Sequence, residues 1–125
     1  HCMNVDENLT ELFRRIVFNI AVSNCDDHLR NHGFIYYPKG WTLSPAYDLT
    51  PDPAGYGLKL NISETDNSLD FDLALSITPY LGIKKDKAMA IVEQIKSVVA
   101  EWRKVAKRYG ISNSEQDLVE NAFRY

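Results

Sequence analysis

Residues 9–37 read LTELFRRIVFNIAVSNCDDHLRNHGFIYY, and the pattern of residue types changes twice along them. Apolar residues first recur every three or four positions, which is typical of the buried face of a helix. Asn8 and Glu11 flank the start of this pattern as a variant of the capping box. We therefore expect a helix that begins at Asn8 and ends near Val22, followed by a polar segment over residues 23–33.

Two short strands are expected after the polar segment. Residues 34–37 and 41–43 contain aromatic and β-branched side chains, and turn-forming residues separate them, so they predict a small antiparallel hairpin. Residues 50–68 hold several prolines and glycines and predict an irregular loop, with one short strand over residues 58–62.

The second half of the chain is predicted to be helical. Its expected helices are one over residues 69–81, a long amphipathic one over residues 88–106 that closes near Gly110, and a last one that begins with a capping box of Ser112 and Glu115. Pro79 is expected to kink the first of these helices and Gly82 to end it. The predicted fold class is therefore mainly α, as a single domain over residues 1–125 with a small β-hairpin after its first helix.

The composition is that of an ordinary globular domain. The 125 residues are 45% hydrophobic and 25% charged, which excludes a disordered tail or a coiled-coil rod. No apolar run reaches the length that spans a membrane, and the first seven residues lack the order of a signal peptide, so no membrane contact is expected and the expected location is cytoplasmic. Cys2 and Cys25 are then expected to be free thiols, and the tryptophans Trp41 and Trp102 are expected in the core.

The charge is unevenly distributed. The net charge is −3, so direct binding of nucleic acid by the whole chain is not expected. Residues 84–108 hold eight Lys and Arg against three acidic residues, which leaves −8 for the rest. This basic segment is either a solvated face against its own acidic domain or a surface for an acidic partner.

Three residues near the hairpin could carry chemistry. Antiparallel pairing should return Asp48, after the second strand, to the neighbourhood of Asn31, before the first strand. Asn31 and Asp48 offer the hard oxygen ligands that Mg²⁺ prefers, and Asp26 could accept a proton from an attacking hydroxyl. The order Asp-x₄-Asn, hairpin, Asp is that of protein-kinase-type phosphoryl transfer. Taken alone, Asp-x₄-Asn is a weak signal, and Asp48 also fits a turn cap before Pro51.

Residues 12–19, 24–34 and 41–51 together resemble the C-terminal lobe of HipA-family kinases, the toxin serine/threonine kinases of bacterial HipA–HipB toxin–antitoxin systems. The helical remainder is similar to the tail of that lobe in length and pattern, so the resemblance covers essentially the whole chain. It implies a kinase-like helical C-lobe that transfers the γ-phosphoryl group of ATP to a Ser or Thr hydroxyl. Family substrates include aminoacyl-tRNA synthetases, and family partners include a HipB-type antitoxin.

The resemblance also implies a role for each site residue. Asp26 is expected to be the catalytic aspartate, and Asn31 and Asp48 are expected to bind Mg²⁺ and thereby ATP. His28 matches a histidine of the family pattern and is expected to brace this cofactor-binding loop by hydrogen bonds. No glycine-rich phosphate loop and no sheet lobe precede Leu9, so the chain is expected to hold about half of a kinase. The missing N-terminal lobe would come from a longer protein or from a separate partner.

Other interpretations of the same residues stay open. The chain could be a non-catalytic, kinase-derived module that holds an antitoxin or another protein partner through residues 84–108. A metal-dependent hydrolase could use Asp26, Asp27, His28 and His32, and the two histidines have the i, i+4 spacing of a zinc site. Lipid or small-molecule phosphotransferases are related alternatives. Within the segment, Asp27 is expected to be solvated or to cap a helix, and Cys25 to be a packing residue.

Overall fold

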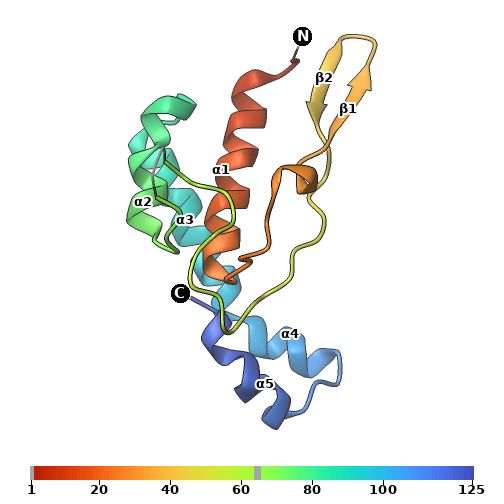
Figure 1. Ribbon diagram of the computed structural model, residues 1–125, viewed down its shortest axis with the longest axis vertical. Helices are drawn as coiled ribbons and strands as arrows, with labels where there is room; N and C mark the ends of the chain where they lie inside the picture. Colours follow the sequence, from red (N-terminus) through yellow and green to blue (C-terminus); the bar gives the residue numbers. More distant parts are fainter. Residues whose placement is uncertain (1, 64–65) are drawn as a thin grey trace.

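The computed structural model describes residues 2–63 and 66–125. Within these residues the elements are α1 (Val5–Ala21), β1 (Phe34–Tyr37), β2 (Gly40–Leu43), α2 (Phe71–Ser76), α3 (Lys85–Ala100), α4 (Trp102–Arg108) and α5 (Asn113–Val119), with 3-10 turns at Leu29–Asn31, Thr78–Leu81 and Glu120–Ala122. Helix α1 lies between α2 and α3 on one side and the hairpin on the other, and α4 and α5 extend beyond its C-terminal end (Figure 1). The predicted mainly α fold with a minor β part is confirmed.

The core forms along one face of α1. Phe13, Val17 and Ile20 are completely buried and cluster with Ala74 of α2 and with apolar residues of α3. Their spacing of three and four residues places them on one side of the helix. Burial of each large side chain contributes roughly 1.5–3 kcal/mol, so α1 is anchored and its C-terminal end forms a rigid base for the polar segment.

Helix α1 begins earlier than its sequence pattern predicts. Its first residue is Val5, so the prediction of a capping box at Asn8 is wrong. The Asn8 side chain instead donates to the Met3 carbonyl at 2.7 Å and accepts from Thr42 Oγ1 at 2.9 Å. Asn8 therefore ties α1 to the hairpin, a contact that only the tertiary structure creates.

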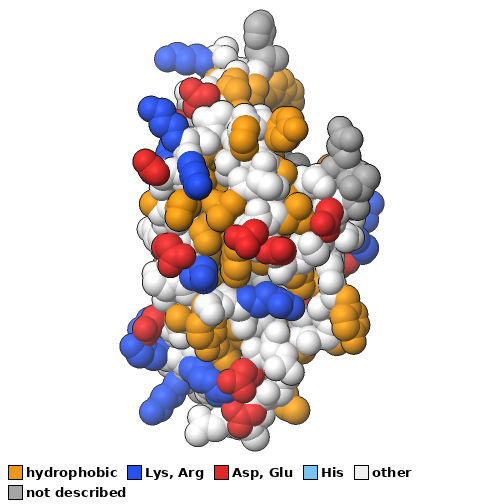
Figure 2. All heavy atoms as spheres, turned by 90° about the vertical axis from the view of Figure 1, so that its left-hand side faces the viewer, with side chains coloured by type: hydrophobic (Ala, Val, Ile, Leu, Met, Phe, Trp, Pro, Cys, Tyr) orange, Lys and Arg blue, Asp and Glu red, His pale blue; other side chains and the backbone are white. Residues whose placement is uncertain are grey.

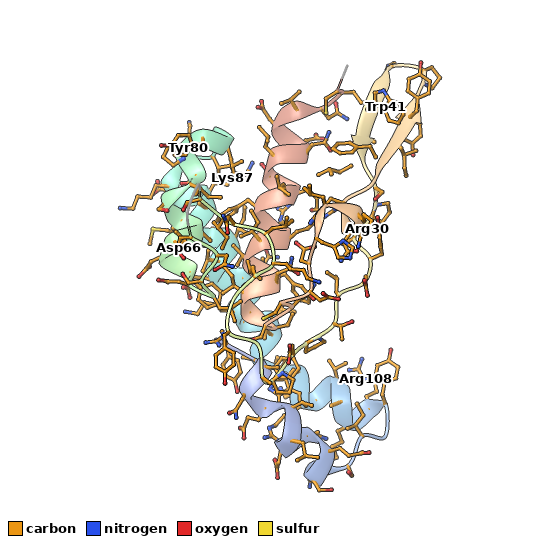
Figure 3. The ribbon with its side chains drawn as sticks, in the orientation of Figure 1. Arg30, Trp41, Asp66, Tyr80, Lys87 and Arg108 are labelled. Atoms are coloured by element: carbon orange, nitrogen blue, oxygen red, sulfur yellow. The ribbon has the colours of Figure 1, made fainter. Side chains whose placement is uncertain are left out.

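The hairpin is confirmed, with Phe34 opposite Leu43 and Tyr37 opposite Gly40. Gly40 has φ 136°, a conformation that side chains disfavour, so glycine suits the end of the turn. Every residue of β1 is exposed, and Trp41 is 46% exposed and lies against Tyr36. The prediction that Trp41 belongs to the core is wrong because the hairpin projects from the helices, as its label in Figure 3 shows.

Three predictions about the later elements need correction or refinement. Among the described residues, 58–62 form no strand; Leu58 N donates to the Asn67 carbonyl, which closes an irregular loop. The helix predicted over residues 69–81 divides into α2 and a 3-10 turn, and Gly82 ends it as predicted, with φ 65°. The helix predicted over residues 88–106 divides at Glu101 into α3 and α4.

The end of the chain follows the sequence signals more closely. The predicted capping box of α5 is present, because Ser112 Oγ accepts from Glu115 N and the Glu115 carboxylate accepts from Ser112 N. The predicted core position of Trp102 is confirmed, and its ring stacks on Phe123 with a centroid distance of 4.1 Å. No helix within the described residues is long and apolar enough to cross a bilayer.

Candidate active site

The polar segment folds into a tight turn at the C-terminal end of α1. Asn24 N donates to the Asn19 carbonyl at 2.8 Å, and Ser23 adopts a left-handed conformation with φ 52°. Both Ser23 and Asn24 are 1% exposed. The chain therefore reverses direction at a buried point, which fixes where the following residues leave the helix.

Asp26 follows this turn and is accessible. Its carboxylate is 73% exposed and accepts from Lys59 Nζ at 2.5 Å. This hydrogen bond, together with the positive charge of Lys59, holds the pKa of Asp26 below its ordinary value. Asp26 also lines a cavity of about 440 Å³ with Cys25, Thr50 and Asp52. An ionised carboxylate at the edge of a cavity has the form that a proton acceptor needs.

Asn31 ends the 3-10 turn Leu29–Asn31, where its N–H donates to the His28 carbonyl at 2.8 Å. It is 6% exposed, and its buried Nδ2 has no hydrogen-bond partner among the described residues. Buried polar groups are normally satisfied, so this unused N–H donor points to a missing acceptor, such as a water or a ligand oxygen. The prediction that the His28 side chain braces the loop is not supported, because His28 Nδ1 is also buried without a partner in this part of the chain.

Asp48 lies beyond the hairpin in an exposed, left-handed conformation with φ 59°. Within residues 2–63 and 66–125, no hydrogen bond or ion pair reaches its carboxylate. Its neighbour Tyr47 donates from Oη to the carbonyl of Arg30 at 2.5 Å, and Ser44 N donates to the Gly33 carbonyl at 2.9 Å. The segments that carry Asn31 and Asp48 are thus hydrogen-bonded to each other; Figure 3 labels Arg30 in the turn between α1 and β1.

Asp27 is the clearest correction within the site. It is 7% exposed, so the prediction of a solvated or helix-capping residue is wrong. Its Oδ2 lies 2.9 Å from His32 Nε2 and accepts from Asn19 Nδ2 at 3.1 Å. The zinc and hydrolase alternatives lose their cluster, because Asp27 pairs with His32 while Asp26 pairs with Lys59. Across the described residues, no three His, Cys, Asp or Glu side chains gather as a metal site.

Sequence reasoning missed residues of α1 that support the site. Asn19 stands seven residues after Leu12 and three after Ile16, so a polar residue on the apolar face was the available signal. Arg15 is 5% exposed and donates to the Ser44 carbonyl, which holds the segment leading from β2 toward Asp48. No local pattern distinguishes Arg15 from its neighbour Arg14.

The two cysteines are free, as predicted. Cys25 packs against the loop that follows Asp48, where a Cβ added to Gly55 would overlap its Sγ. Burial raises the pKa of the Cys25 thiol, so the neutral form is favoured. Its position supports the packing role that the sequence predicts.

The basic residues of 84–108 lie among acidic ones. Lys96 pairs with Glu93, and Arg103 pairs with both Asp117 and Glu120. Figure 2 shows Lys and Arg side chains interspersed with Asp and Glu over the α2–α3 side of the molecule. This arrangement favours the solvated-face interpretation of the segment.

Comparison with known families defines the class of protein. Residues 1–102 match the family described as HipA-like C-terminal domain, and the chain therefore belongs to this family. The match includes α1, the hairpin, α2 and α3, and it ends at the first residue of α4. Membership relates the chain to HipA-like proteins of toxin–antitoxin systems. No curated protein and no solved structure gives a significant match.

Proposed function

We propose that the chain is the catalytic-lobe portion of a HipA-like serine/threonine kinase, which transfers the γ-phosphoryl group of ATP to a Ser or Thr hydroxyl of a protein substrate. The observation that carries the proposal lies at the junction of α1 and the hairpin. There, within a HipA-like domain, the buried amide of Asn31 with its unpaired Nδ2, the free carboxylate of Asp48 and the ionised carboxylate of Asp26 occupy hydrogen-bonded segments.

The donor set suits Mg²⁺. The ion prefers oxygen ligands and usually takes one or two from the protein, with phosphate oxygens and water completing the shell. Asn31 and Asp48 would hold it through an amide oxygen and a carboxylate oxygen, and neither side chain has another partner among the described residues. When bound, the ion neutralises charge on the phosphate oxygens of the nucleotide. His28, whose buried Nδ1 has no partner among the described residues, is the third residue proposed to bind the nucleotide.

Asp26 would act on the acceptor hydroxyl. Its carboxylate accepts the hydroxyl proton while the hydroxyl oxygen bonds to the γ-phosphorus and the bond to the β–γ bridging oxygen breaks. An aspartate with a lowered pKa is ionised at neutral pH, and the exposure of Asp26 leaves it open to a protein substrate. Lys59 would have to share or release the carboxylate for the hydroxyl to approach.

A second lobe would complete the nucleotide site. The chain has no glycine-rich phosphate loop. The exposed aromatic residues of the hairpin (Phe34, Tyr36, Tyr37 and Trp41) offer a surface that such a lobe could cover. We propose that the lobe comes from another segment or another chain, and that a HipB-like antitoxin is a further partner.

The metal part of the proposal is tested on the 125-residue chain with Mn²⁺ as a paramagnetic probe. Mn²⁺ with a non-hydrolysable ATP analogue should broaden the amide resonances of Asn31 and Asp48, and Asp48→Asn should weaken this broadening. Asp86→Asn, an exposed aspartate on α3, is the matched control. Uniform broadening over all carboxylates would contradict the site.

The transfer part is tested with the nucleotide-binding lobe supplied in the same polypeptide or as a separate chain. Transfer of labelled phosphate from ATP to a Ser/Thr acceptor protein should fall roughly 10²–10⁴-fold in Asp26→Asn. The Asp86→Asn control should keep full activity. A fully active Asp26→Asn protein would show that Asp26 takes no part in the chemistry. If substitution of Asp26, Asn31 or Asp48 leaves the binding of a protein partner unchanged, the non-catalytic binding module is favoured instead.

A further inference from the structure

We infer that Asn19, Asn24 and Asp27 are positioning residues that hold the turn bearing Asn31 and the segment bearing Asp48 in one fixed relation. Their side chains form a continuous hydrogen-bond chain from the end of α1 to both segments. The inference rests on the proposed function, because it is Asn31 and Asp48 whose placement matters.

One end of this series of hydrogen bonds reaches the 3-10 turn that bears Asn31. His32, the residue after Asn31, places Nε2 2.9 Å from Asp27 Oδ2. The same Oδ2 accepts from Asn19 Nδ2 at 3.1 Å. Because Asn19 belongs to the anchored helix α1, the turn is held to the core through Asp27 and cannot move without breaking a buried contact.

The other end of this series of hydrogen bonds reaches the segment that bears Asp48. Asn24 Nδ2 donates to Asn19 Oδ1 at 3.0 Å and lies 3.5 Å from the carbonyl oxygen of Asp48. Asp48 has φ 59°, a strained conformation for a non-glycine residue, and such a conformation persists only where surrounding contacts impose it. A donor directed at its carbonyl is one such contact.

Burial strengthens these hydrogen bonds and makes their loss costly. Asn19 and Asn24 are 1% exposed and Asp27 is 7% exposed. Hydrogen bonds are stronger in such surroundings, and a buried group that loses its partner is costly. Asn19 is the central member, because its amide both donates to Asp27 and accepts from Asn24.

The test compares variants of the 125-residue chain. Asn19→Leu has a similar shape but removes both central bonds, and Asn24→Ser interrupts the same chain outside the helix if Asn19→Leu does not fold. Asp27→Asn is the conservative variant, since its amide oxygen can still accept from Asn19 and His32. Gln116→Leu deletes a different buried amide, 2% exposed and bonded to the Ile111 carbonyl, and is the matched control.

The first measurement is the metal-free ¹⁵N–¹H spectrum. Asn19→Leu or Asn24→Ser should shift the amide resonances of both Asn31 and Asp48, whereas Asp27→Asn should leave them near their wild-type positions. Gln116→Leu should shift neither. If both disruptive variants leave Asn31 and Asp48 where Gln116→Leu leaves them, the positioning role is overturned.

The second measurement is the Mn²⁺ affinity of the same variants. Removal of residues that orient metal ligands typically lowers affinity roughly 10–100-fold, and this loss is expected for Asn19→Leu but not for Gln116→Leu. An unchanged affinity in Asn19→Leu would contradict the inference. A wild-type chain that shows no site-specific Mn²⁺ effect would instead contradict the proposed metal site, while the metal-free spectra would still decide whether the two segments are coupled.

Discussion

The ion pair between Lys59 and Asp26 brings together residues that lie 33 positions apart in the sequence. Both side chains are exposed, 59% and 73%, so solvent screens the pair and its effect on stability is small. Its effect on the protonation of Asp26 is more specific, because the hydrogen bond from Lys59 is the largest cause of the lowered Asp26 pKa. Lys59 therefore adjusts the proposed proton acceptor without belonging to its motif.

The substitution Lys59→Met should return the pKa of Asp26 toward its ordinary value, which a ¹³C-detected carboxyl titration measures directly. The folded-state pKa lies below the unfolded one, so the pair stabilises the fold above the ordinary aspartate pKa. This stabilisation is lost as the pH falls through the lowered value. Lys59→Arg keeps the charge and should keep the shift; an identical Asp26 titration in Lys59→Met would show that Lys59 has no influence.

Among the helices and strands, a sequence pattern predicts the structure correctly where both interacting residues lie close together in the sequence. The capping box of α5 needs only Ser112 and Glu115, three residues apart, and it forms as predicted. The division at Glu101 lies beside a long-range contact, since Trp102 stacks on Phe123 near the end of the chain. A continuous apolar pattern over residues 88–106 does not contain that information.

The substitution Ser112→Ala should lower the free energy of unfolding by about 1 kcal/mol, since an N-cap hydroxyl satisfies a backbone N–H at the start of the helix. Urea unfolding followed by circular dichroism measures the change. Ser97→Ala, which removes an exposed hydroxyl bonded to the Gln94 carbonyl inside α3, is the control and should change stability less. Equal effects of the two substitutions would argue against the capping role.

At the scale of the molecule, the end of the chain closes onto the start of the polar segment. Arg124 N donates to the Ala21 carbonyl at 2.6 Å, and Arg124 Nε donates to Ser23 Oγ at 3.2 Å. Figure 1 shows the C-terminus beside the lower end of α1. Residues beyond the family match thus support the turn from which Asp26 and Asn31 leave the helix.

The substitution Arg124→Met should loosen this turn, since it removes the bond to the left-handed Ser23. A loss of about 1 kcal/mol corresponds to roughly fivefold faster amide exchange, expected in residues 22–26 and measured by hydrogen-exchange NMR. Arg108→Met, at the far end of α4, should leave these amides unchanged. Unaltered exchange in Arg124→Met would show that the turn is stable without the tail.

The sequence by itself determined the helical class, the hairpin and the family, because helix periodicity, strand composition and the spacing of Asp26, Asn31 and Asp48 are local properties of the chain. It did not determine the surroundings of those residues. Aspartate is a residue type that usually lies at the surface, and only the fold buries Asp27 between Asn19 and His32. Lys59 and Arg124 reach the site across long stretches of chain, and such contacts depend on how the helices pack, which no local pattern encodes.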